Sequence, residues 1–411
     1  MARLFMDSLI TAAASALAAG DPLRALNCVA LREDAPALAL RGIAMAQLGD
    51  LPQAQHLLKR AARAFGPQQP LAHARCVVAQ AEIAFVSRKL AWPVKELATA
   101  QATLKQNGDA LNAVHACHLQ ARRSLLLGQL EDAERLLGTI DPAPLPPIRR
   151  AAHEMILAGI AMQRLRTSPA RAALARAQEA AHRSHIPALK AEVAAAAQRL
   201  ETPVARHITG DHERLILLAD VESLLASGTL VVDACRRVVR RGKMVIPLAS
   251  RPVLFALARA LAGAWPNDVC RTDLLRAAFQ AKRVDESHRA RLRVEIGRLR
   301  QLLRPLADVE ATPQGFALRP RNDVAVNVLA WPVEEEHGAV LAFLADGEAW
   351  SSSALALALG ISQRTVQRSL DVLATEGKVQ WFGRARARRW TSSSVPGFTT
   401  IMLLPTLLPG S

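Results

Sequence analysis

The chain has 411 residues, of which 51% are hydrophobic and 4% aromatic, and it contains no tyrosine. This length accommodates two or three domains, and the apolar half of the residues provides for a sizeable core. A composition dominated by Ala and Leu, with few β-branched runs, predicts a mainly α-helical protein. No stretch reaches the roughly 18 apolar residues that span a bilayer, so we expect no membrane partner.

The formal net charge is +16 and is unevenly distributed. Residues 206–321 carry 21 basic and 12 acidic side chains, residues 322–351 carry none and six, and residues 352–411 carry seven and two. A basic excess of this size indicates a polyanionic partner, either nucleic acid or an acidic membrane surface. An arginine-rich codon usage is the alternative, and it explains the excess in residues 1–205 better than the excess near the C-terminus.

The cysteines are odd in number and form no Cys-x-x-Cys pair, which favours a reduced, cytoplasmic compartment; they are Cys28, Cys76, Cys117, Cys235 and Cys270. One metal-like cluster, His115-x-Cys117-His118, does not converge on a helix, whereas zinc needs four ligands in a tetrahedron. We therefore expect no metal site. The sequence contains no phosphate-binding loop, no GxSxG motif and no Gly-rich nucleotide turn, so we expect no cofactor and no enzymatic activity.

Residues 1–205 are expected to form helical pairs. The first twenty residues mimic a signal peptide, but Asp7 interrupts their apolar run, so we interpret them as a first structural helix. In residues 39–66, small residues at Gly42, Ala54 and Ala61 would let two antiparallel helices approach closely around a turn at Gly49. This spacing resembles that of a tetratricopeptide repeat. Further copies are indicated by Ala121, Gly128, Ala133, Leu137, Ile140 and Pro142, and more weakly around residues 20–22 and 159–177.

The repeat pattern is irregular, because Leu or Met fills the positions where large aromatic residues are usual. A single all-α bundle without repeat geometry is therefore the alternative. Stacked pairs would create a concave surface that suits partner binding, dimerisation or ligand sensing, and the sequence does not choose among these.

Residues 206–322 change character. Short β-branched runs on either side of Gly242-Lys243 predict a small strand pair that ends at residues 246–248. Three helices and a hairpin are then expected, covering residues 251–266, 272–279, 286–303 and 309–318. In the third helix the inward-facing residues are Leu292, Ile296, Leu299 and Leu303.

This order of strands, three helices and hairpin resembles the C-terminal DNA-binding domain of OmpR/PhoB-type response regulators. The matching pieces are LRVEIGRLRQLL, VEATPQGFAL and the strands before residue 248. In that family the third helix enters the major groove and the wing touches phosphate or the minor groove. The resemblance implies contacts from Arg291, Arg293, Arg298 and Arg300 on the helix and from Thr312 on the wing. Gly297, where the family often has Arg, and Glu295, which would repel phosphate, depart from the pattern; a winged domain retained for packing or dimerisation is the alternative.

Residues 323–336 are interpreted as an acidic connector because of the run Glu334-Glu335-Glu336. We expect this run either to keep the linker off DNA or to rest on a basic surface when DNA is absent. Residues 395–411 form an apolar tail that is too short for a bilayer and is expected to pack against a wing or a partner.

Residues 337–394 contain the most specific pattern in the chain. A short helix over residues 354–359 is broken by Gly360, and Ser362 can cap the helix that follows. In that second helix the residues at i, i+4 and i+7 face inward, and they are Val366, Leu370 and Leu373. After Gly377, two extended pieces flank Gly383-Arg384 and predict a basic hairpin.

This segment resembles the winged helix-turn-helix of DeoR-like bacterial repressors over about forty residues. The sugar-binding domain of those repressors has no counterpart here. Arg and Gln pair bidentately with guanine and adenine, and the N-terminal part of a recognition helix enters the major groove. We therefore expect contacts from Ser362, Gln363, Arg364, Thr365, Gln367 and Arg368, and contacts to phosphate or the minor groove from Arg384 and Arg386 on the hairpin. A solvated helical hairpin with one charged face is the alternative.

These features predict a mainly α protein, in which a tetratricopeptide-like array precedes two winged helix-turn-helix units with small β-hairpins. The expected function is that of a cytoplasmic, bacterial-type transcription regulator that binds double-stranded DNA sequence-specifically. An effector, either a protein or a small molecule, would act on the helical half, and a homodimer is compatible with the pattern. The competing hypothesis is a non-catalytic scaffold whose repeats and winged units contact other proteins.

Overall fold

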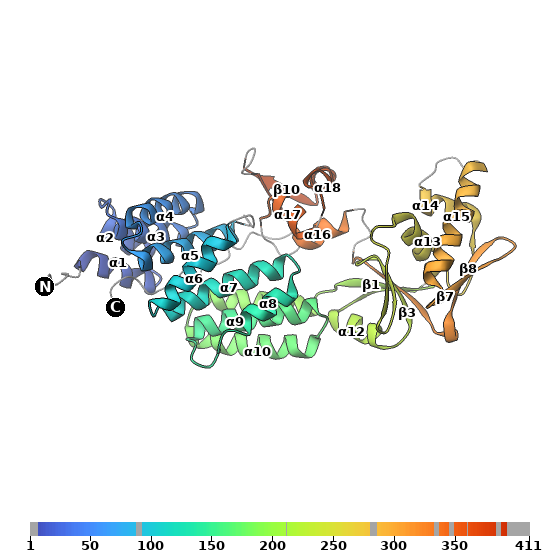
Figure 1. The fold of residues 1–411 in the computed structure, drawn as a ribbon, viewed down its shortest axis with the longest axis horizontal. Coiled ribbons are helices and arrows are strands. Elements are labelled where there is room, and N and C mark those ends of the chain that lie inside the picture. The colour runs from blue at the N-terminus through green and yellow to red at the C-terminus, as the bar shows by residue number, and fades with distance from the viewer. Residues whose placement is uncertain are drawn as a thin grey trace. The chain divides into compact units, whose positions relative to one another are not determined.

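The computed structural model describes residues 7–87, 93–210, 212–279, 286–332, 337–344, 349–359, 361–383 and 388–392. The protein is mainly helical and carries small β-sheets in its C-terminal half, as the composition predicts (Figure 1). It divides into two compact units. One comprises residues 1–163, 168–197 and 340–411, and the other comprises residues 164–167 and 198–339. Within the described ranges, every helix is too short or too polar to cross a membrane.

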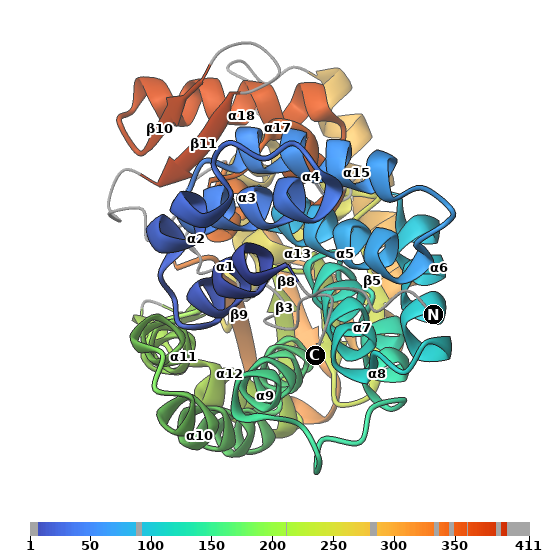
Figure 2. The same cartoon turned by 90° about the vertical axis from the view of Figure 1, so that its left-hand side faces the viewer.

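The first unit begins with a series of helices, which we call the array. Its members are α1 (Ser8–Ala18), α2 (Pro22–Val29), α3 (Ala35–Gln47), α4 (Leu51–Phe65), α5 (Pro70–Val86), α6 (Val94–Gln106), α7 (Ala110–Leu126), α8 (Leu130–Leu137), α9 (Pro147–Gln163), α10 (Thr167–Ser184) and α11 (Pro187–Gln198). From α1 to α9 each helix contacts the next, and α1, α3, α5, α7 and α9 also contact one another in that order. Helical hairpins therefore stack side by side, and Figure 2 shows them following a curved path.

A repeated Gly-Asp turn separates the helices of the array. Gly20, Gly49 and Gly108 have φ values of 77°, 89° and 79°, which a residue without a Cβ adopts readily. The residue after each is an aspartate whose carboxylate accepts a hydrogen bond from a backbone N–H in the first turn of the next helix. The predicted turn at Gly49 is confirmed, and the same turn, a glycine with positive φ followed by a capping aspartate, occurs at Gly20 and Gly108.

Two glycines permit close contact between helices of the array. A Cβ on Gly42 in α3 would lie 2.8 Å from Leu58 Cγ in α4, and a Cβ on Gly159 in α9 would lie 2.6 Å from Leu125 Cδ2 in α7. The close approach that the small residues of 39–66 predict is therefore present. Side chains of α1 to α5 form one continuous core that includes Leu58, and Leu125 packs against a separate cluster of α7, α8 and α9.

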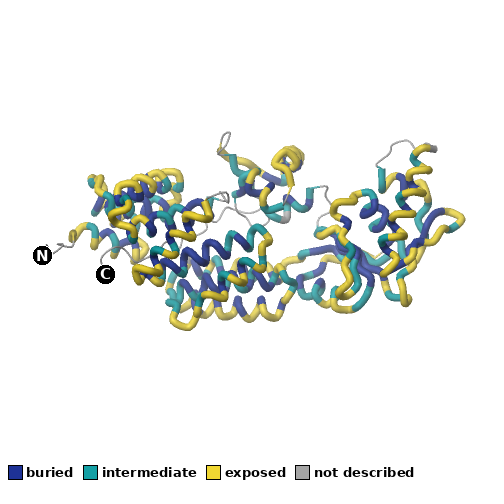
Figure 3. The backbone as a smooth tube through the Cα atoms, in the orientation of Figure 1, coloured by how far each residue is buried: buried dark blue, intermediate teal, exposed yellow. Residues whose placement is uncertain are grey.

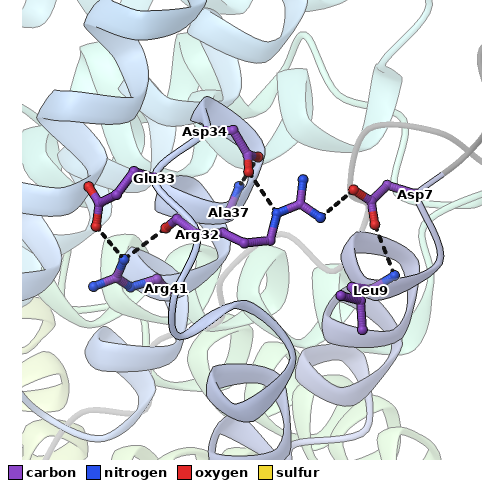
Figure 4. Close-up of polar contacts among 7 residues, drawn as sticks. All are labelled: Asp7, Leu9, Arg32, Glu33, Asp34, Ala37 and Arg41. Carbon is purple, nitrogen blue, oxygen red and sulfur yellow. Dashed lines mark hydrogen bonds and ion pairs between the residues drawn. The ribbon is translucent and has the colours of Figure 1, made fainter.

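Arginines tie down the loop between α2 and α3 (Figure 4). Arg32 donates to Asp34 at 2.7 Å and also bonds to Asp7, the N-cap of α1. Arg41 donates to the Arg32 carbonyl at 2.9 Å and to Glu33 at 3.0 Å. These bonds connect the starts of α1 and α3 through one exposed loop.

The second unit is built on a six-stranded sheet in the order β2-β1-β9-β3-β4-β5. The strands are β1 (Ala205–Thr209), β2 (His212–Ile216), β3 (Leu230–Asp233), β4 (Val238–Arg241), β5 (Met244–Pro247) and β9 (Val326–Ala330), with α12 (Leu218–Ala226) and the short 3-10 helices Arg199–Glu201 and Arg321–Asp323 beside them. The predicted strand pair around Gly242 is β4–β5. The strands β1 and β2 are not apparent from the sequence, because their residues mix charged and apolar types without clean alternation.

The prediction of an acidic connector over residues 323–336 is wrong for its first half. Residues 326–330 form β9, which pairs antiparallel with β1 and parallel with β3. Every residue of β9 is buried, and Figure 3 shows buried, dark backbone in the sheet of this unit. In the sheet β9 lies between β1 and β3, so its five residues do not need the alternation of apolar and polar side chains that usually indicates a strand. Without that alternation, so short a segment is easily mistaken for a linker. Glu334, Glu335 and Glu336 lie outside the described residues.

We call residues 252–320 the middle region. It contains α13 (Pro252–Gly263), β6 (Val269–Cys270), α14 (Arg271–Phe279), α15 (Glu286–Leu303), β7 (Ala307–Ala311) and β8 (Gly315–Pro320). The strands form a three-stranded sheet in the order β6-β8-β7. The predicted helices and hairpin are confirmed, and the predicted inward residues of α15 are buried in the core of this unit.

We call residues 338–392 the C-terminal region. It contains α16 (Gly338–Leu344), α17 (Ser352–Leu359), α18 (Gln363–Thr375), β10 (Val379–Phe382) and β11 (Arg389–Ser392). Trp350 lies between α16 and α17 and bridges to β11, since its N–H and that of Trp390 each donate to the other's carbonyl at 2.7 Å. The predicted inward residues Val366, Leu370 and Leu373 are buried. The predicted apolar tail lies outside the described residues.

Candidate nucleic-acid interface

One face of α18 carries three exposed polar side chains. Arg364, Gln367 and Arg368 occupy positions i, i+3 and i+4, which are neighbours on a helix surface. None of the three hydrogen-bonds or ion-pairs with a described residue. The guanidinium groups and the amide are therefore available to a ligand at the N-terminal half of the helix. Asp371, also exposed, follows on the same stripe and ends the basic surface there.

The other predicted residues of α18 hold the helix start in place. The Ser362 hydroxyl accepts a hydrogen bond from the Thr365 N–H at 3.2 Å and lies 2.8 Å from the Thr365 hydroxyl, which confirms the predicted N-cap. Gln363 donates to the Ser352 hydroxyl at 3.0 Å and so links α18 to the start of α17. These three side chains are exposed, but each already has at least one hydrogen-bond partner.

The hairpin β10–β11 presents aromatic side chains that the sequence analysis did not single out. Trp381 is 51% exposed and Phe382 is 54% exposed. The Arg388 guanidinium lies over the Trp381 ring at 4.3 Å and over the Trp390 ring at 5.5 Å. Arg384 and Arg386 lie outside the described residues. The signal that reveals this surface is a Trp-Phe pair next to a turn glycine, a position where large aromatic residues are uncommon.

Three of the four predicted arginines of α15 have intramolecular partners. Arg291 stacks on the Phe279 ring at 4.7 Å, and Arg298 donates to Glu295 at 2.9 Å. Arg300 donates to the Val309 carbonyl at 2.5 Å, so its side chain turns back toward the hairpin. Arg293 is exposed and contacts no described residue through a hydrogen bond or ion pair.

The hairpin of the middle region is held from both sides. The Thr312 hydroxyl accepts from the Gly315 N–H at 2.9 Å and donates to Asp268. Arg271 donates to the carbonyls of Pro313 at 2.9 Å and Thr312 at 3.1 Å. Thr312 therefore stabilises the turn through both hydrogen bonds of its hydroxyl, and its predicted contact with DNA stays a prediction. Arg271, which the sequence analysis passed over, fixes the turn.

A buried polar network lies where α5, α7 and α9 meet. Arg149 in α9 donates to His115 Nδ1 at 2.7 Å, so the opposite nitrogen, His115 Nε2, donates to Glu82 in α5 at 2.9 Å. Burial lowers the pKa of His115 well below its usual value, and it raises the pKa of Glu82 to about 8 against the opposing pull of Arg149 and Arg122. The network couples three inner helices through groups that are expensive to bury alone.

Two further imidazoles, those of His118 and His153, lie near this network. His118 Nε2 and His153 Nδ1 lie 3.3 Å apart, and the Nδ1 atom of His118 is buried without a partner. Burial lowers the pKa of both side chains. Cys117 instead donates to the Leu136 carbonyl at 3.4 Å. His115, Cys117 and His118 thus face different partners, and no group of three potential metal ligands converges among the residues that the structure describes.

The comparisons with known proteins returned nothing: no protein-family model, no curated protein and no solved structure matches the chain. The function is therefore inferred from the geometry of the middle region, the C-terminal region and the array.

Proposed function

We propose that the protein is a sequence-specific DNA-binding transcription regulator whose C-terminal region reads base edges in the major groove. The observation that carries the proposal is the free face of Arg364, Gln367 and Arg368 at the N-terminal half of α18. Arg and Gln are the side chains that make paired hydrogen bonds to guanine and adenine. The helix bearing them is preceded by a short helix and followed by a hairpin, as in winged helix-turn-helix domains.

The middle region is proposed as a second, weaker DNA contact. Its elements follow the same order, but the free cation on the helix is Arg293, since the guanidinium groups of Arg291, Arg298 and Arg300 already stack or hydrogen-bond within the protein. An isolated arginine suits a phosphate, which contributes affinity and register without base recognition. We therefore assign sequence reading to α18 and electrostatic support to α15.

The array is proposed as a tetratricopeptide-like docking surface for an effector or a second copy of the chain. Its support is the stacking of helical hairpins, in which the odd-numbered helices contact one another in series. Such stacking creates a continuous inner surface in repeat proteins.

The test is a gel-shift titration with a duplex that the full chain selects from a random pool. The double substitution Arg364→Ala with Arg368→Ala should weaken binding at least about thirtyfold, because each lost base contact costs about 1–3 kcal/mol. The matched control, Arg135→Ala with Arg183→Ala, removes the same charge from exposed positions on α8 and α10 and should bind like the wild type. Unchanged affinity in the first double variant would refute the proposal and leave the scaffold hypothesis.

A further inference from the structure

The strand β5 is an outer edge of the six-stranded sheet, and its sequence, MVIP, is apolar. Met244 and Val245 are 49% and 47% exposed, and they project to opposite faces of the strand. An exposed apolar edge pairs readily with another chain, so proteins usually protect their edge strands with charged side chains. The opposite edge of the sheet, β2, has that protection, because its sequence is HERLI. The edge at β5 lacks it.

The backbone of β5 has hydrogen-bonding groups that no described residue occupies. The Leu248 N–H donates to the Arg237 carbonyl at 2.9 Å, and the register continues into β4 with Val238 opposite Pro247. Hydrogen-bonded pairs alternate with non-hydrogen-bonded pairs in an antiparallel ladder, so Val245 and Pro247 direct their backbone groups to the open side. The Val245 N–H and both carbonyls are therefore available to an added strand. Pro247 has no N–H, which suits an outward-facing position on an edge strand.

Cations lie at both ends of this edge. Lys243 directly precedes β5, and Arg237 lies opposite Leu248, the residue that follows the strand. Both cationic side chains are exposed, and neither forms a hydrogen bond or ion pair with a described residue. Residues 234–266 contain seven basic side chains and no acidic one. A second copy of this edge would bring like charges together, whereas an acidic segment would neutralise them.

We propose that β5 binds an extended acidic segment of a partner protein, which joins the sheet as an additional strand. The backbone of that segment would pair with Val245 and Pro247, and its β-branched or apolar side chains would cover Met244. Its carboxylates would lie near Lys243 and Arg237, which are separated by the length of a four-residue strand, about 13 Å.

A polypeptide fits this edge better than a nucleic acid does. Phosphates would satisfy the cations but would leave the open backbone groups and the apolar side chains of β5 without partners. The edge includes no residue of α15 or α18, so the inference goes beyond the proposed DNA binding and does not depend on it.

The probe is a fluorescein-labelled peptide in which alternating valine and threonine residues lie between two pairs of glutamates. Its binding to the full chain is measured by fluorescence anisotropy. A second peptide of equal charge has proline at alternate positions, so it cannot pair along an edge, and it should bind at least about tenfold more weakly. Hydrogen exchange resolved to single residues should show that the first peptide protects the Val245 amide and leaves exchange at Ile246, which faces β4, unchanged.

Two variants separate the contribution of the backbone from that of the charge. Val245→Pro removes the outward N–H without removing a hydrogen bond to β4, and it should weaken binding of the first peptide about tenfold. Lys243→Glu should weaken binding about fivefold at low salt, whereas Arg214→Glu, the matched change on the edge strand β2, should leave it unchanged. Lys243→Glu remains decisive if Val245→Pro disturbs the sheet.

Equal binding of the two peptides, or binding without protection of the Val245 amide, would overturn the proposal. If neither peptide binds and a DNA duplex instead loses affinity in Lys243→Glu, the edge is a nucleic-acid contact and the proposal is wrong. Self-association of the full chain that Val245→Pro abolishes would overturn it as well, because the occupant would then be a second copy.

Discussion

The middle and C-terminal regions place their elements in the same order but use their polar side chains differently. Each has a helix, two further helices and a hairpin; after the first helix the middle region has the short strand β6, which pairs with β8, and the C-terminal region has the single residue Trp350, which bridges to β11. In the middle region, arginines on the third helix and beside the hairpin bind the protein itself. In the C-terminal region, three adjacent polar side chains of α18 are free.

This difference shows that exposure and positive charge do not by themselves define a binding surface. Arg298 is exposed, yet its guanidinium donates to Glu295, and a nucleic acid would have to compete with that bond. Arg364 has no such competitor. The density of basic residues is greater in the middle segment, but the three adjacent polar side chains without an intramolecular partner lie in the C-terminal one.

The largest effect is expected from a change to the hairpin of the middle region. A Cβ on Gly315 would lie 1.7 Å from the Val269 carbonyl oxygen, a distance that forces β6 away from β8. Gly315→Ala should therefore destabilise this unit by about 3 kcal/mol or more. Hydrogen exchange of the full chain, measured by mass spectrometry, should show faster exchange in peptides from residues 252–320 and unchanged exchange in α18. Wild-type protection throughout would mean that the strand pairing is not as described.

A pair of single substitutions compares the two helices directly. Arg364→Ala should cost about 2 kcal/mol on the selected duplex and relax the choice of one base, because a base contact is lost. Arg293→Ala should weaken all duplexes alike and reduce the salt dependence by about one counterion, because a phosphate contact is lost. Competition binding at several salt concentrations separates the two. If Arg293→Ala changes sequence preference instead, the roles assigned to α15 and α18 are reversed.

Much of the local structure was predictable from the sequence, because it depends on local signals. The apolar spacing of α15 and α18, the Ser362 cap and the turn glycines act within a few residues, so the helices and hairpins of both regions are close to those expected. The strand β9 was missed because its partners, β1 and β3, lie roughly a hundred residues earlier in the chain. Long-range pairing has no local signature.

Which site residues have partners was equally hidden from the sequence. The sequence near Arg300 does not show that its side chain turns toward the Val309 carbonyl. The sequence near Thr312 does not show that its hydroxyl donates a hydrogen bond to Asp268. The same holds for His115, whose partners Glu82 and Arg149 each lie more than thirty residues away. Only folded geometry distinguishes a free cation from an engaged one.

Acid is expected to lower the free energy of unfolding of the array. The pKa of His115 and of His118 is lowered by burial, so the unfolded chain binds protons below pH 6.5 that the folded chain does not. Glu82 acts in the opposite sense, because its pKa of about 8 lets the folded chain keep a proton that the unfolded chain releases above about pH 4.5. With His153 as the third, three imidazoles outweigh one carboxyl, so the unfolding free energy of the array should fall by about 1–2 kcal/mol per pH unit between pH 6 and pH 5.

Urea titrations of the full chain between pH 7 and pH 5, followed by hydrogen exchange in peptides of α5, α7 and α9, measure this effect. His118→Asn removes one titrating group and should flatten the pH dependence, whereas His56→Asn on α4, outside the network, should leave it unchanged. An array whose stability is constant over this range would show that the buried imidazoles do not control it.

The smallest effect is expected at Gly297 on α15, where the OmpR/PhoB-type domains that the sequence resembles often have an arginine. A Cβ there meets no atom within 4 Å, and the residue lies on the exposed side of the helix. Gly297→Ala should therefore stabilise the middle region by about 0.5–1 kcal/mol, because alanine loses less backbone entropy in a helix. Urea denaturation should show a higher midpoint with the same slope, and DNA affinity should be unchanged if Arg293 alone contacts the phosphate. A loss of affinity would instead mean that the backbone at Gly297 approaches the DNA. The helix α15 would then lie closer to the DNA than a single phosphate contact from Arg293 requires.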